Sequence, residues 1–149
     1  MVQRSAIPKV VGILMIVFAS LGLFHTLITT LQAMLASEAI PGNSFSKVIL
    51  IFALLDFGIG FLHLVAGIRA LGYKDNAPRL AMLYGVLKIV TSLGFMVVMY
   101  AWIGGDVGNG EGTLIGTIFG VMAVFYLAWP ITVLALMSRP AARASCTNF

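Results

Sequence analysis

Four ionisable side chains interrupt long apolar stretches of the sequence: His25, Asp56, His63 and Lys88. Groups of this kind can exchange protons, pair with one another or bind a cation. An ionisable residue inside a membrane segment is by default a functional candidate. A charge at mid-bilayer costs about 2.5–3.5 kcal/mol on insertion scales, so Asp56 requires a partner or a proton. We therefore treat these four residues as the candidate intramembrane polar site.

The stretches around these residues are long enough to cross a membrane. Each of the four holds 24 to 27 residues, and about 20 are enough for a helix to span a bilayer. The chain is 60% hydrophobic and 9% charged, whereas a soluble domain carries about 25% charged residues. A soluble helix bundle would need polar helix faces, which these runs lack. We predict an all-α integral membrane protein, an antiparallel four-helix bundle that forms a single domain over 1–149. Its spans are 10–36, 48–71, 80–103 and 113–137, followed by a short cytoplasmic tail at 138–149.

Basic residues are distributed unequally between the two sides of the predicted bundle. One side carries Arg4, Lys9, Arg69, Lys74, Arg79, Arg139 and Arg143, and the other carries Lys47 with Glu38, Asp106 and Glu111. Cationic loops stay in the cytoplasm, so we expect both termini to be cytoplasmic, in the inner membrane of a bacterium. The expected partner of the basic side is the lipid bilayer, with its anionic headgroups. Aromatic residues do not interleave the basic ones in a binding stripe, so nucleic acid is not an expected partner.

The second span places several candidate residues on one helix face. Asp56, Gly60, His63 and Gly67 are spaced at i, i+4, i+7 and i+11, a spacing that keeps them together. At about 1.5 Å per residue, Asp56 and His25 both lie roughly 22 Å from the cytoplasmic ends of their spans, so they can pair. Lys88 is the alternative partner, although its Cα lies about 10 Å from the depth of Asp56 by the same rise. Lys88 shares its depth with His63.

Glycines form a second feature of interest. The fourth span carries a doubled G-x-x-x-G at Gly112, Gly116 and Gly120, a small-residue surface that favours close helix packing, either within the bundle or in a homodimer. Weak internal sequence similarity also suggests that the bundle is a parallel repeat of two helical hairpins. Its halves open with Ile7-Pro8-Lys9 and with Ala77-Pro78-Arg79.

Several functions remain open at this stage. We expect a non-enzymatic assembly partner or accessory subunit, since the chain consists almost entirely of membrane spans. The alternative is a homo-oligomeric transporter or channel, in which Asp56 and His25 carry protons or coordinate a cation and His63 and Lys88 line the inner half. The third possibility is a redox subunit with bis-histidine haem b ligation.

Neither a catalytic centre nor a metal site is expected from the sequence. Nucleophile motifs such as G-x-S-x-G are lacking, and no pair among the histidines and Asp56 has the i, i+3 or i+4 spacing that places ligands together. No cofactor is expected unless the haem alternative holds. Cys146 is the single cysteine, and we expect it to be a free thiol in a disordered tail.

Overall fold

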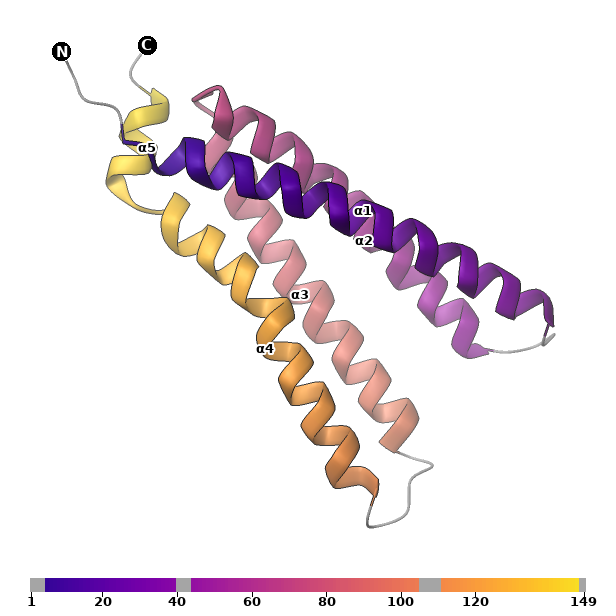
Figure 1. Cartoon of the computed structure of the whole chain (residues 1–149). Coiled ribbons are helices and arrows are strands. Elements are labelled where there is room, and N and C mark those ends of the chain that lie inside the picture. Colours follow the sequence, from indigo (N-terminus) through magenta and orange to yellow (C-terminus); the bar gives the residue numbers. More distant parts are fainter. Residues whose placement is uncertain (1–4, 40–43, 105–110, 148–149) are drawn as a thin grey trace.

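The computed structural model describes residues 5–39, 44–104 and 111–147, and every regular element in these ranges is a helix. Four long helices follow one another: α1 (Ile7–Ala39), α2 (Ser44–Leu71), α3 (Ala77–Gly104) and α4 (Glu111–Met137). The short α5 (Pro140–Thr147) comes last (Figure 1). The predicted all-helical class is confirmed for the described residues. Each predicted span lies within one long helix, which extends past it by up to four residues at either end.

Within the part of the chain that the structure describes, three helices are long and apolar enough to cross a membrane: the segments Ile7–Leu35, Lys47–Leu71 and Ala77–Ala101. The remaining long helix, α4, has 27 residues and contains the shorter apolar stretch Tyr126–Met137. Large apolar side chains are exposed along the three segments, including Phe24 (65%), Phe61 (60%) and Val97 (67%). A soluble monomer rarely exposes apolar surface so extensively. These features are consistent with an integral membrane protein.

The long helices form two antiparallel hairpins. α1 packs along α2, α3 packs along α4, and α2 also contacts α3. The hairpins meet where both chain termini lie, and they separate towards their opposite tips (Figure 1). We call the meeting point, formed by residues 5–9, 69–79 and 137–147, the closed end. Neighbouring helices in the sequence are thus antiparallel neighbours in space, while α1 and α4 touch over a small area.

The buried core lies at and just beyond the closed end. Its buried members are Val11, Met15, Ile59, Ala66, Ala70, Ala77, Ala81, Tyr84, Val133, Met137 and Cys146. Alanine supplies four of these positions, and small residues allow membrane helices to approach closely. At the closest α1–α2 approach, a Cβ added to Gly12 would lie 2.7 Å from the backbone nitrogen of Leu71 and 2.8 Å from the carbonyl oxygen of Gly67. The first hairpin is therefore held by backbone-to-backbone packing.

The turn between α2 and α3 has a recognisable hydrogen-bond pattern. The N–H of Lys74 donates to the carbonyl of Arg69, and the N–H of Tyr73 donates to the carbonyl of Ala70. This pair of bonds is the Schellman motif, whose residue after the helix cap adopts a left-handed conformation. Tyr73 holds that position with a φ of 51°, although glycine is the residue type that this position usually favours. The glycine of this turn, Gly72, lies one residue earlier. The Tyr73 hydroxyl donates to the carbonyl of Ser5 at 3.4 Å, which ties the turn to the start of α1.

The segment after α4 corrects one expectation. Residues Pro140–Thr147 form α5 rather than a disordered tail, and Cys146 is fully buried in the core. Proline is favoured in the first turn of a helix, because its missing N–H would have no partner there. The hydroxyl oxygen of Ser145 accepts a hydrogen bond from the backbone N–H of Ser5 at 2.9 Å. α5 therefore docks against the beginning of α1 and closes this end of the molecule.

Candidate intramembrane polar site

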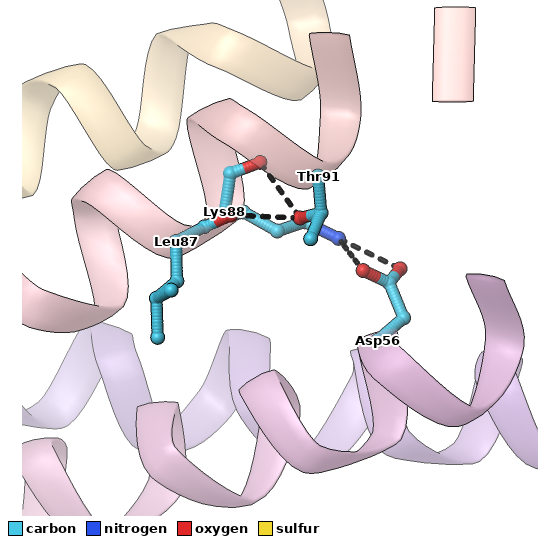
Figure 2. A network of polar contacts seen from close by, with 4 residues as sticks. All are labelled: Asp56, Leu87, Lys88 and Thr91. Atoms are coloured by element: carbon cyan, nitrogen blue, oxygen red, sulfur yellow. Dashed lines mark hydrogen bonds and ion pairs between the residues drawn. The ribbon is translucent and has the colours of Figure 1, made fainter. Parts of the chain in front are cut away.

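An ion pair joins the two hairpins. Lys88 of α3 donates to both carboxylate oxygens of Asp56 on α2, at 2.7 Å each (Figure 2). The ammonium group thus contacts both carboxylate oxygens at the same distance. Hydrogen bonds between two charged groups are shorter and stronger than those between neutral groups. The pair is thus a direct polar link between helices that are otherwise joined by apolar contacts.

The observed helix ends bring Lys88 within reach of Asp56. α3 begins at Ala77, three residues before the predicted start of the span, so Lys88 lies 11 residues into the helix. Asp56 lies 15 residues before the end of α2. At 1.5 Å per residue the two Cα depths differ by about 6 Å, a gap that a lysine side chain spans. His25 is instead exposed on α1.

The ion pair is only partly enclosed. The side chain of Asp56 is 36% exposed and that of Lys88 is 19% exposed. The Lys88 ammonium also lies 6.0 Å from the ring centroid of Tyr126 on α4, at the limit of a cation–π contact. Beside it, the hydroxyl of Thr91 donates to the carbonyls of Leu87 and Lys88 on its own helix (Figure 2). Asp56 is therefore the more exposed member of the pair.

His63 lies in a separate cluster that reaches all four long helices. Its ring is buried and stacks on Tyr84 of α3, with centroids 3.8 Å apart and planes 9° from parallel. The indole N–H of Trp129 on α4 donates to Nε2 of His63 at 3.2 Å. Trp129 in turn packs on Phe18 of α1 at 4.8 Å between centroids. Because Nε2 accepts this bond, the neutral ring carries its proton on Nδ1. His63 is thus a packing residue at the junction of the hairpins.

The candidate glycines have different surroundings. Gly67 lies buried against Gly12, and a Cβ added to Gly60 would meet the side chain of Leu23 at 2.8 Å. Gly120 is exposed, with nothing within 4 Å of an added Cβ. Gly112 and Gly116 lie in the first turns of α4, and their surroundings are outside the described part of the chain. The first hairpin therefore uses Gly60 and Gly67 for packing, while Gly120 presents an open surface.

Close packing in the second hairpin depends on a glycine that sequence reasoning missed. A Cβ added to Gly85 of α3 would lie 2.6 Å from the side chain of Leu134 and 3.2 Å from the carbonyl of Pro130, both on α4. Gly12 of α1 was missed in the same way. Both lie within apolar sequence and outside a G-x-x-x-G pattern, and a small residue in such sequence is the signal for close helix approach.

The remaining polar side chains bear on what chemistry is available. Hydroxyls of Ser20, Thr29, Thr30 and Thr132 donate to carbonyls one turn earlier in their own helices, so they are satisfied locally. Among the described residues, no group of three or more His, Cys, Asp or Glu side chains gathers to hold a metal ion. Haem ligation by His63 would require Nε2 to release Trp129. The site can therefore hold charge, share a proton or bind a polar partner through Asp56.

No family model, curated protein or solved structure matches the chain. Function is therefore inferred from the arrangement of these side chains.

Proposed function

We propose that the chain is a non-enzymatic subunit of a membrane assembly, and that it binds a further membrane helix beside Asp56. The observation that carries this proposal is the 36% exposure of the Asp56 side chain within a helix whose apolar segment is Lys47–Leu71. Acyl chains offer no hydrogen bonds to a carboxylate, and intramembrane charges face partners or water. A neighbouring helix with a hydrogen-bond donor, from a second copy or from another subunit, satisfies the open carboxylate.

The proposed placement follows from length and charge. The 27 residues of α4 are enough for a fourth span, which gives a four-helix bundle in the bilayer. The closed end carries the exposed Lys9, Arg69, Lys74, Arg79, Arg139 and Arg143. This excess of basic residues supports a topology in which the closed end, and with it both termini, lies on the cytoplasmic side of an inner membrane.

Purification in mild detergent, followed by native mass spectrometry, tests the proposal. The informative variant is the double substitution Asp56→Leu/Lys88→Leu, because it removes both charges together and leaves neither one unpaired. Leu54→Ala is the matched control, since Leu54 is a 61% exposed apolar residue on the same helix. We expect the wild type and the control to retain a second copy or another membrane subunit, and the double variant to lose it. A wild-type chain that stays monomeric in all mild detergents contradicts the proposal.

A homo-oligomeric transporter or channel is the second candidate, favoured by the same open carboxylate if it faces water instead of a helix. The ion pair of Asp56 and Lys88 would then carry the proton or hold the cation. Flux in proteoliposomes separates the two candidates. A transporter loses flux when Asp56→Asn removes the charge, whereas an assembly subunit shows no flux in either form.

A further inference from the structure

The closed end is ringed by exposed basic side chains. Six of them are described, and they come from several elements at this end: Lys9 of α1, Arg69 of α2, Lys74 in the turn, Arg79 of α3, Arg139 before α5, and Arg143 within it. We call these six residues the basic collar. Asp75 is the single acidic side chain in the segments that form the closed end, and one of its oxygens accepts a hydrogen bond from the backbone N–H of Asn76. The collar therefore carries a large positive excess.

Hydrogen bonds hold the segments of the basic collar together. Ser5 links the start of α1 to α5 through Ser145 and to the α2–α3 turn through Tyr73. On the α3 side, the guanidinium of Arg143 donates to the sulfur of Met82 at 3.5 Å, one turn from Arg79. On the α2 side, Arg69 donates to the side-chain oxygen of Asn76 at 3.5 Å. The charges thus lie around one folded surface and not on independent tails.

The position of the basic collar along the helices matches the depth of lipid headgroups. Lys9 lies in the first turn of α1, Arg69 in the last turn of α2 and Arg79 in the first turn of α3, next to the apolar segments that enter the bilayer. Long basic side chains at such borders extend towards the headgroup region. Each Lys or Arg near an anionic membrane surface contributes about 1 kcal/mol, which is roughly a fivefold change in binding.

We propose that the basic collar is a binding surface for anionic phospholipid headgroups, which the folded chain retains as bound lipids. The hydrogen bonds that join the segments of the collar distinguish this surface from basic residues on independent tails. The inference is independent of the assembly proposed above, because it involves the closed end and not the carboxylate of Asp56.

Lipid retention in native mass spectrometry tests the proposal directly. The protein in mild detergent is supplied with equal amounts of phosphatidylglycerol and phosphatidylcholine, and the bound lipids are counted. The variant is Arg69→Gln/Lys74→Gln/Arg79→Gln, which leaves Lys9, Arg139 and Arg143 to maintain the orientation. Lys47→Gln is the matched control, because Lys47 is an exposed basic residue at the other end of α2.

We expect the wild type and the control to retain phosphatidylglycerol over phosphatidylcholine by at least about tenfold, and the triple variant to lose most of this preference. The single substitution Lys74→Glu, in the turn, provides a second variant with little effect on the helices and should lower the preference by about fivefold or more. Raising the salt concentration should reduce the preference of the wild type. Equal retention of the two lipids by the wild type, or an unchanged preference in both collar variants, overturns the proposal.

Discussion

Removing one member of the Asp56–Lys88 pair should destabilise the protein more than removing both. Each single leucine substitution leaves one charge in an apolar segment, where the cost on insertion scales is about 2.5–3.5 kcal/mol. Asp56 is 36% exposed, so part of this cost is relieved, and we expect each single variant to lose about 1–3 kcal/mol of unfolding free energy. The double variant leaves no unpaired charge and should stay within about 1 kcal/mol of the wild type.

The two single variants should also differ from each other. When Asp56→Leu removes the carboxylate, the lysine side chain can turn towards the headgroups and recover part of its hydration. The short side chain of Asp56 has no such route when Lys88→Leu removes the ammonium. We therefore expect Lys88→Leu to be the more damaging substitution.

Reversible unfolding in mixed micelles of a mild detergent and dodecyl sulfate measures these free energies. A double-mutant cycle then gives the coupling between the two residues, which we expect to be about 2 kcal/mol. Leu54→Ala, on the lipid-facing side of the same helix, corrects for simple loss of side-chain volume. Additive single substitutions, with a coupling below about 0.5 kcal/mol, would refute the view that the pair links the hairpins.

The other predictions concern packing at and near the closed end. Gly12→Leu forces side-chain atoms into the neighbouring backbone and should cost at least about 2 kcal/mol of unfolding free energy in the same assay. Gly22→Leu, with open space at its Cβ, is the control and should be tolerated. Equal effects of the two substitutions would contradict the close approach of α1 and α2. Trp129→Phe removes the donor to His63 and should cost about 0.6–1.7 kcal/mol, and a cycle with His63→Phe should show the two losses to be non-additive. Burial raises the pKa of the Cys146 thiol, so maleimide should modify it more slowly than a free thiol at pH 8. Because the folded form favours the neutral thiol, the contribution of Cys146 to stability is present below the ordinary thiol pKa and is lost as the pH rises through the pKa of the folded state. Modification by maleimide at the rate of a free thiol would show that α5 does not stay docked.

The helices themselves were predictable from composition, because apolar runs of this length have one common solution in a bilayer. The exact ends of the helices were less predictable from the sequence. The start of α3 at Ala77 rather than Leu80 changes the depth of Lys88 by about 4.5 Å and brings it within reach of Asp56. α1 also begins before its predicted span, at Ile7, so depth alone does not separate Lys88 from His25. Helix start signals near Pro78 were visible, but their effect on the pairing depends on how α2 and α3 cross.

Contacts between distant helices were not predictable from spacing within each helix. His63 and Trp129 are 66 positions apart, and the large apolar residues of either run do not distinguish a face towards another helix from a face towards lipid. Leucine and valine serve both surfaces equally well, because lipid tails are as apolar as the side chains. The separation of the hairpins was hidden for the same reason. α5 was missed because a short helix of ordinary composition is stabilised by docking and not by its own propensity.

The core lies at and just beyond the closed end, so the two hairpins form arms that are joined at that end and diverge from it (Figure 1). α2 and α3 each have 28 residues, so each arm is about 42 Å long. A change of about 10° in the angle between the arms would displace their far tips by roughly 7 Å relative to each other, with little movement at the closed end. Among the described residues, the contacts that resist a change of this angle beyond the core include the Asp56–Lys88 bond and the edge contact between Phe52 and Phe95. A partner bound beside Asp56 is therefore expected to influence the distance between the tips of the two hairpins.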